Sequence, residues 1–252
     1  MRRPDTLIGV QPVTTFTRRA LTLAAALAGA VMLTACSGGG APDGHSAYER
    51  EGDRGVGPID APVTIIEYAS TSCPGCGAFY NQGKPAIDDA VERGDVRFVF
   101  REMLTGQPNL ARAGFMLARC APEDQYLDVI DLLFEQQRAL FSAMQQGNAQ
   151  AQFLSIARTA GFSDEEFRAC MTNQEVLEAV EEANMQAVRD GVGGTPHFII
   201  NGQDLDQMAG ENGQVYAANG EPLVDDQGEI PAQIDRDTWD RIIALFKARA
   251  EG

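Results

Sequence analysis

The chain has 252 residues, of which 44% are hydrophobic, and a formal net charge of -16. It is long enough to bury a full hydrophobic core as one domain or two small ones. Its acidic balance argues against nucleic acid and anionic lipid surfaces as partners, because both would repel it.

An apolar run of 13 residues lies near the N-terminus, at positions 20–32. It follows the pair Arg18 and Arg19 and is too short for an ordinary membrane-spanning helix. This pattern predicts a signal peptide over residues 1–35. The arginine pair partly resembles a twin-arginine export signal, so the twin-arginine and general secretory routes both stay open.

The apolar run ends in Leu33-Thr34-Ala35-Cys36, which resembles a bacterial lipobox. The resemblance implies that Cys36 carries lipid and anchors the protein on the periplasmic side of the bacterial cell envelope. In a Gram-negative cell, Ser37 in place of an aspartate implies sorting to the outer membrane. The glycine-rich residues that follow predict a flexible tether over 36–57, with a reach of about 25 Å. Ordinary cleavage beside an unmodified Cys36 is the alternative.

The five cysteines are Cys36, Cys73, Cys76, Cys120 and Cys170. The export signal places them in an oxidising compartment, where an odd count needs an explanation. If Cys36 carries lipid, Cys73 pairs with Cys76 and Cys120 with Cys170. We predict that the second pair is a structural disulfide closing a loop of about 50 residues. Two buried free thiols or a second redox pair are the alternatives.

A Cys-Pro-Gly-Cys motif at 73–76 directly follows a segment rich in β-branched residues, 61–70, which predicts a buried strand. Pro74 suits the first position of a helix, where no N–H donor is needed. The N-terminus of a helix stabilises a thiolate and lowers the pKa of a cysteine there. We therefore expect Cys73 to be the exposed nucleophile and Cys76 to be the resolving thiol.

The helix of the motif is expected over residues 74–93, with an interruption near Gly83 and a cap from Thr71 or Ser72. A second buried strand follows at 95–103. Together these segments predict a strand, a helix and a further strand around the cysteine pair.

Residues from 109 to 190 carry apolar side chains at helical spacing, and the first part, about 109–175, is predicted to be a helical insertion. A short strand at 197–200 comes after it, and Asn201-Gly202 predicts a hairpin turn. Acidic residues and turn signals over 211–235 predict a loop insertion with one or two small hairpins. A last helix is expected at 236–250.

This order of elements resembles the DsbA-like branch of the thioredoxin superfamily, the exported thiol:disulfide oxidoreductases. The resemblance covers about residues 58–210 and the last helix. It implies an α/β thioredoxin fold with a helical insertion between the second and third core strands, in one domain over 58–252. It also implies that the redox-active centre is the Cys73–Cys76 disulfide, with no metal and no organic cofactor.

The resemblance also implies roles for three residues. Glu67, six residues before Cys73, matches a buried acid that handles the proton of the buried thiol; an exposed strand glutamate is the alternative. Pro196 matches a cis-proline that lies against the active-site disulfide. Thr195 would present its backbone to an extended substrate peptide.

One position departs from the family pattern, because Gly75 stands where DsbA has a histidine. That histidine helps to hold the thiolate, so its loss makes Cys73 less acidic and the disulfide a weaker oxidant. His197 follows Pro196 and is a candidate to replace the imidazole in part, although an ordinary strand residue is the simpler interpretation. A reductase or isomerase of specific envelope proteins is therefore an alternative to an oxidase.

The predicted partners are cysteine-containing exported proteins and a membrane redox partner that recycles the pair. A copper-binding module that uses Cys73 and Cys76 is an alternative from another class, although a closed metal site usually needs a second close pair of ligands. A non-catalytic scaffold in the envelope is a further alternative.

Overall fold

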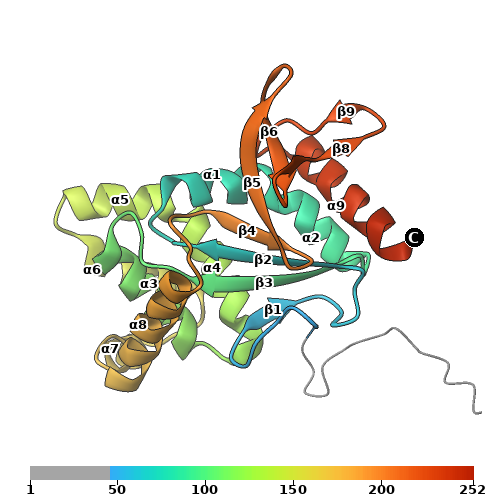
Figure 1. Ribbon diagram of the computed structural model, residues 1–252. Helices are drawn as coiled ribbons and strands as arrows, with labels where there is room; N and C mark the ends of the chain where they lie inside the picture. The colour runs from blue at the N-terminus through green and yellow to red at the C-terminus, as the bar shows by residue number, and fades with distance from the viewer. Residues whose placement is uncertain (1–45) are drawn as a thin grey trace, which may run out of the picture. The chain divides into compact units, whose positions relative to one another are not determined.

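The computed structural model describes residues 46–252 of the chain (Figure 1). Within these residues, no helix combines the length and the apolar character that crossing a membrane requires. The predicted signal peptide over 1–35, the lipidation of Cys36 and the first part of the tether lie outside the described residues.

A mixed sheet of seven strands forms the centre of the fold, in the order β1-β3-β2-β4-β5-β6-β7. Strands β2 and β3 run parallel, and the other neighbouring strands pair antiparallel. The strands of this sheet are β1 (Arg54–Val56), β2 (Val63–Ala69), β3 (Val96–Glu102), β4 (His197–Ile200), β5 (Gln203–Gly210), β6 (Gly213–Ala218) and β7 (Glu221–Pro222). A separate small hairpin consists of β8 (Val224–Asp225) and β9 (Gly228–Glu229).

Strand β2 lies at the centre of the sheet, and every one of its residues is buried. Successive side chains of a strand point to opposite faces of the sheet. Ile65 belongs to the larger core cluster with Phe79 and Trp239, whereas Ile66 and Tyr68 belong to a smaller cluster. Glu67 alternates with Ile65 and therefore faces the larger core.

Two groups of helices surround the sheet (Figure 1). Six helices lie between β3 and β4, and the other three helices of the described residues lie outside this stretch. The six are α3 (Pro108–Cys120), α4 (Tyr126–Glu135), α5 (Gln137–Gln145), α6 (Ala149–Thr159), α7 (Asp164–Met171) and α8 (Gln174–Arg189), with a 3-10 turn at Glu123–Gln125. Helices α3 to α7 occupy the segment predicted as the insertion, and α8 packs on β3. The other helices are α1 (Pro74–Gln82), α2 (Lys84–Glu92) and α9 (Arg236–Glu251).

The predicted interruption of the motif helix is confirmed, because Gly83 separates α1 from α2. A Cβ atom at this glycine would lie 2.7 Å from the Phe79 ring and 2.7 Å from the carbonyl oxygen of Ile234. Gly83 therefore lets the chain bend where the helix approaches the segment before α9.

The predicted disulfide between Cys120 and Cys170 is confirmed, with a Cα–Cα distance of 6.0 Å. It joins the last residue of α3 to α7, close to the end of that helix. The bridge thus ties two helices of the insertion together.

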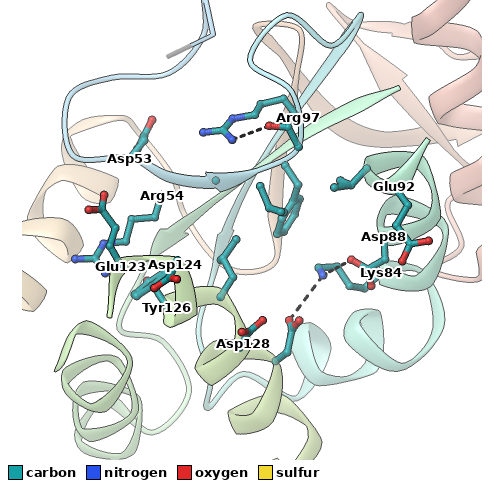
Figure 2. A pocket seen from close by; sticks show the side chains of 17 residues that line it. Asp53, Arg54, Lys84, Asp88, Glu92, Arg97, Glu123, Asp124, Tyr126 and Asp128 are labelled. Atoms are coloured by element: carbon teal, nitrogen blue, oxygen red, sulfur yellow. Dashed lines mark hydrogen bonds and ion pairs between the residues drawn. The ribbon is translucent and has the colours of Figure 1, made fainter. Parts of the chain in front are cut away.

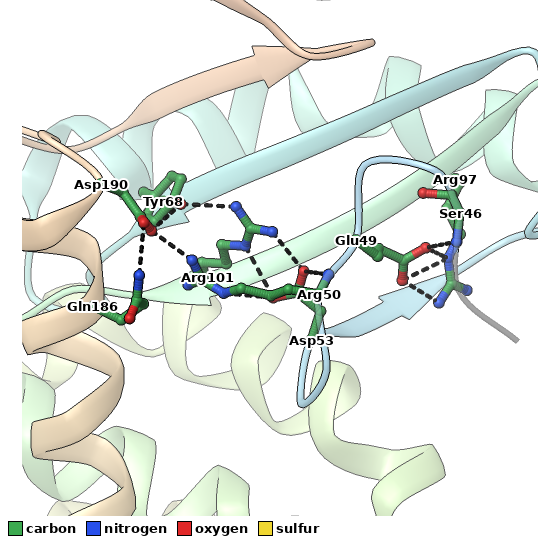
Figure 3. A network of polar contacts seen from close by, with 9 residues as sticks. All are labelled: Ser46, Glu49, Arg50, Asp53, Tyr68, Arg97, Arg101, Gln186 and Asp190. Carbon is green, nitrogen blue, oxygen red and sulfur yellow. Dashed lines mark hydrogen bonds and ion pairs between the residues drawn. The ribbon is translucent and has the colours of Figure 1, made fainter. Parts of the chain in front are cut away.

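The prediction of a flexible tether was wrong for residues 46–57, which belong to the folded domain. Strand β1 pairs with β3, with Arg54 opposite Phe100. Figure 3 shows acids of this segment on arginines of β3: Glu49 lies 2.7 Å from Arg97, and Asp53 lies 2.6 Å from Arg101. Glycine content suggested a flexible chain, but these ion pairs and the strand pairing hold the segment on the sheet.

The segment 211–235 forms the predicted hairpins but is not a separate loop. Strands β6 and β7 extend the central sheet, and the β8–β9 hairpin follows. Asp225 of the hairpin lies 2.7 Å from Arg241 on α9, in an ion pair between largely buried side chains. The segment is therefore an integral part of the domain, and it extends the sheet beyond β5.

Candidate active site

Cys73 lies at the end of the short turn that connects β2 to α1. It is the N-cap residue of α1, Pro74 occupies the first turn, and the Cys73 side chain is nearly buried at 9% exposure. The expected cap from Thr71 or Ser72 is wrong, because neither side chain bonds to the start of α1. Ser72 instead donates a hydrogen bond to the carbonyl oxygen of Thr105 at 2.8 Å, and so holds the loop after β3 beside the motif.

The Thr195-Pro196 peptide bond, just before β4, is cis. It lies directly against the motif: the Sγ of Cys73 is 3.2 Å from the carbonyl oxygen of Thr195. A Cβ atom at Gly75 would lie 3.3 Å from the Cδ of Pro196, so the motif and the proline are in close contact. The Thr195 hydroxyl also shares a 2.5 Å hydrogen bond with the hydroxyl of Thr105.

The pKa of Cys73 is lowered to about 5. The main cause is a hydrogen bond from the Cys76 side chain; the Thr195 side chain and the backbone of Cys76 and Gly75 add to it, while partial burial opposes it. The thiol contact to the Thr195 carbonyl favours the protonated form, but the donors around the sulfur outweigh it. A thiolate at a helix N-terminus is the expected result of such donors.

Cys76 has the opposite character. It is fully buried, and burial together with the hydrogen bond to Cys73 raises its pKa above that of an ordinary thiol. Both cysteines are free thiols in this structure. At neutral pH, therefore, Cys73 is the thiolate of the pair and Cys76 keeps its proton.

Glu67 is completely buried beneath the motif. Neither of its carboxyl oxygens has a hydrogen-bond partner among the residues that the structure describes. Burial raises its pKa well above the usual range, and the charge of Asp131 adds to the rise, whereas the charge of Lys84 acts in the opposite direction. Glu67 in turn contributes to the raised pKa of Cys76, which places the two groups within electrostatic reach of each other.

Lys84, the first residue of α2, is a charged neighbour of Glu67 that the sequence reasoning missed. Its side chain is almost buried, and its ammonium lies 2.6 Å from Asp88, 3.7 Å from Asp131 and 4.9 Å from the centre of the Phe98 ring. Lys84 and these three neighbours line a pocket of about 740 Å³, which Figure 2 shows. Burial raises the pKa of Asp131 to about 6. No sequence signal joins Lys84 to Glu67, because their proximity depends on how α2 packs on β3, the strand beside β2.

His197 lies away from the cysteines. Its Nε2 is 2.9 Å from a carboxyl oxygen of Asp204, and its ring centre is 6.0 Å from that of Tyr68. Tyr68 occupies the face of β2 opposite to Glu67. The imidazole therefore does not replace the histidine that the motif lacks.

Within residues 46–252, no three side chains of the types His, Cys, Asp or Glu are gathered as a set of metal ligands. The two cysteines of the motif thus have no further ligand beside them in this part of the chain.

A strand, a Cys-Pro-Gly-Cys helix start and a cis-proline in contact define a thioredoxin-type thiol site. Residues 49–214 match the family model described as thioredoxin. The chain belongs to the thioredoxin family.

Known proteins share this fold and parts of this sequence. The crystal structure of α-DsbA1 from Wolbachia pipientis matches with a TM-score of 0.62 and 16% identity, covering 81% of this chain and 94% of that one. A protein of Rickettsia typhi named as a protein-disulfide oxidoreductase is 24% identical over 64% of this chain and 58% of its own length. Disulfide bond formation protein D of Bacillus subtilis is 35% identical over 32% of this chain and 38% of its own length. The matched part is little more than half of the Rickettsia protein. The family match and the likeness to the Wolbachia structure confirm the predicted DsbA-like thioredoxin fold.

Proposed function

We propose that this protein is an exported, lipid-anchored thiol:disulfide oxidoreductase that oxidises cysteine-containing exported proteins through Cys73 and Cys76. The observation that carries the proposal is the asymmetry of the pair. Cys73 is a stabilised thiolate at a helix N-terminus, and Cys76, one turn further on, is a buried thiol. The carbonyl oxygen of Thr195, just before the cis bond, lies 3.2 Å from the Cys73 sulfur.

The oxidation takes two exchange steps. A substrate thiolate attacks Sγ of Cys73 in the Cys73–Cys76 disulfide, so that a mixed disulfide forms and the electron pair of the broken bond passes to the sulfur of Cys76. This sulfur takes up a proton. A second substrate thiolate then attacks the substrate sulfur of the mixed disulfide, which forms the substrate disulfide and releases Cys73 as a thiolate. The substrate loses two electrons, and the cysteine pair gains them.

Glu67 is the group that exchanges a proton with Cys76 in this scheme. Burial raises its pKa well above the usual range and so favours the protonated form, from which it can supply the proton that the leaving sulfur of Cys76 needs. In the reverse direction it takes that proton back, and Cys76 resolves the mixed disulfide. A water molecule between the two groups is the expected carrier, because both carboxyl oxygens lack a partner among the described residues.

Thr195 has the role of aligning the substrate. It is only partly buried, and its backbone lies beside the sulfur that reacts. An extended segment of substrate that pairs with this backbone would bring its cysteine to Cys73. Pro196 follows directly and lies in close contact with Gly75 of the motif.

The pKa of Cys73 supports an oxidising direction. A value of about 5 lies between about 7 in thioredoxin and about 3.5 in DsbA. A more acidic thiolate stabilises the reduced form and so makes the disulfide a better oxidant. With Gly75 in place of a histidine, the pair is an intermediate oxidant, and a membrane redox partner returns it to the disulfide form.

The location follows from the N-terminal sequence. The predicted signal peptide and the lipobox at Cys36 support anchoring on the periplasmic side of the cell envelope, at the outer membrane if the cell is Gram-negative. Labelling of cells with a radioactive fatty acid tests the anchor: the wild type takes up label, and a Cys36→Ala variant does not.

The activity is tested with a reduced, unfolded protein that has several cysteines. The oxidised wild type should restore its disulfides, and Cys73→Ser and Cys76→Ser should both abolish this. With a substrate that already carries a disulfide, the Cys73 thiolate of Cys76→Ser should attack that bond, release one substrate thiolate and stay linked to the other sulfur as a mixed disulfide. Full activity in both variants would overturn the proposed function.

A further inference from the structure

Gln137 joins the helical insertion to the backbone of the motif. It is the first residue of α5 and is buried at 6% exposure. Its Nε2 donates two hydrogen bonds, to the carbonyl oxygen of Thr71 at 3.0 Å and to that of Cys73 at 2.9 Å. One side chain from α5 thus binds two backbone carbonyl groups of the motif region, that of Thr71 in the turn after β2 and that of Cys73 at the start of α1.

The contact requires a residue without a side chain at position 77, which is a glycine. A Cβ atom at Gly77 would lie 2.2 Å from Oε1 and 2.8 Å from Cδ of Gln137, which is too close for any side chain. The N–H of Gly77 also donates to the carbonyl oxygen of Cys73 at 3.1 Å. The Gln137 amide therefore packs closely against the first turn of α1, and the Gln137 side chain and the Gly77 N–H both donate to the carbonyl oxygen of Cys73.

The start of α1 needs support from outside its own sequence. Cys73 is its N-cap residue, yet no side-chain hydrogen bond of the usual capping kind forms there. A helix start without such a cap is less firmly fixed. Gln137 leaves the N–H groups of this turn free for the Cys73 sulfur and instead holds the carbonyl oxygens of Thr71 and Cys73, from the turn at Gln136 where α4 ends and α5 begins.

The orientation of this first turn determines the acidity of Cys73. The N–H groups of Gly75 and Cys76 stabilise its thiolate, and hydrogen bonds of this kind weaken steeply when their angle changes. A side chain that fixes the carbonyl of Cys73 also fixes where its sulfur lies relative to those N–H groups.

We propose that Gln137 is a positioning residue for the nucleophile: it holds the first turn of α1 so that the N–H groups of the motif point at the Cys73 sulfur. It touches neither substrate nor reacting atoms. The helical insertion thereby contributes to the reactivity of the thiolate. This inference rests on the proposed role of Cys73.

The test is the titration of the Cys73 thiolate in the reduced full-length protein, followed by its absorbance at 240 nm. Gln137→Met keeps the size and helix preference of the side chain but removes both donors. Its thiolate pKa should rise by roughly half a unit to one unit, the size of a helix-terminus effect. Alkylation of Cys73 should slow by about two- to fivefold at pH 5, and by about three- to tenfold well below pH 5, because the thiolate fraction falls by that factor.

Gln145→Met is the matched control, since Gln145 is exposed at the other end of the same helix. It should leave the titration at the wild-type midpoint. Near-UV circular dichroism shows whether each variant is folded. If Gln137→Met does not fold, Gly77→Ala displaces the amide from the other side and should raise the pKa in the same direction.

A folded Gln137→Met or Gly77→Ala protein with the wild-type midpoint would overturn the inference. A control that shifts as far as Gln137→Met would also overturn it, because the effect would then belong to α5 as a whole. The titration needs no substrate. A wild type that does not oxidise cysteines would therefore defeat the proposed function and leave the role of Gln137 testable.

Discussion

The Sγ of Cys73 lies 3.2 Å from the carbonyl oxygen of Thr195, although 122 residues separate them in the chain. The contact exists because β4, which begins directly after Pro196, pairs with β2. The reactive sulfur, the Thr195 carbonyl and the first turn of α1 thus meet where β2 ends and β4 begins.

The acidity of Cys73 gives a prediction about pH. In the reduced protein the thiolate should titrate near pH 5, whereas a cysteine in the unfolded chain titrates near about 8.5. Since the folded pKa is the lower one, the stabilisation is fully present above about pH 8.5, shrinks as the pH falls toward 5, and is absent below. The free energy of unfolding of reduced wild type minus that of Cys73→Ser isolates this contribution, which should reach a few kcal/mol, on the order of what linkage allows. A flat difference from pH 5 to 8.5 would argue against it.

Glu67 should reduce stability while it serves the reaction. A buried carboxyl group that lacks a protein hydrogen-bond partner costs about 1–3 kcal/mol, and Glu67 has none among the described residues, so Glu67→Leu should raise the free energy of unfolding of the oxidised protein by up to this amount. The same variant should resolve mixed disulfides more slowly, because Cys76 loses its proton partner. Urea unfolding and the lifetime of the mixed disulfide measure the two effects. Glu221→Leu, at an exposed position, should change neither; a Glu67→Leu protein that is less stable than the wild type would contradict the account.

Lys84 and Asp131 should move the titration of Glu67 in opposite directions. Lys84 lowers the pKa of Glu67 and Asp131 raises it, so Lys84→Met should shift the pH midpoint of mixed-disulfide resolution upward and Asp131→Asn should shift it downward. Glu92→Gln is the control, since Glu92 lines the same pocket but is not among the groups that shift Glu67. Shifts in the same direction for both variants would show that these residues do not act on Glu67 by charge.

The Cys120–Cys170 disulfide should contribute stability and no chemistry. It spans 50 residues, for which the chain-entropy model gives about 4 kcal/mol. The Cys120→Ala, Cys170→Ala double variant should lose roughly this free energy of unfolding in urea and should still oxidise a substrate. Loss of exchange activity in a folded double variant would show that the bridge takes part in the reaction.

The sequence was sufficient for the parts of the site that are local in the chain. The buried strand before the motif, the helix start at Pro74, the break at Gly83 and the strand after Pro196 all follow from periodicity and from proline and glycine positions. The Cys120–Cys170 pairing followed from parity. These features depend on residues that are close in the sequence or, for the disulfide, on the number of cysteines.

Features that depend on distant partners could not be predicted in this way. Strand β1 and the ion pairs of Glu49 and Asp53 need arginines that lie 48 residues further on, on β3. Lys84 and Gln137 reach the site because α2 and α5 pack beside it, and neither belongs to a motif. The placement of β6 and β7 in the central sheet likewise depends on the free edge of β5, which only the folded chain presents.

The reduction potential of the Cys73–Cys76 pair, measured by equilibration with glutathione, tests the central claim most directly. The account predicts a value between about -180 and -120 mV, in the range of protein disulfide isomerase and DsbA, because the acidic Cys73 thiolate stabilises the reduced form. A value near about -270 mV, that of thioredoxin, would contradict an oxidising role and make the protein a reductant.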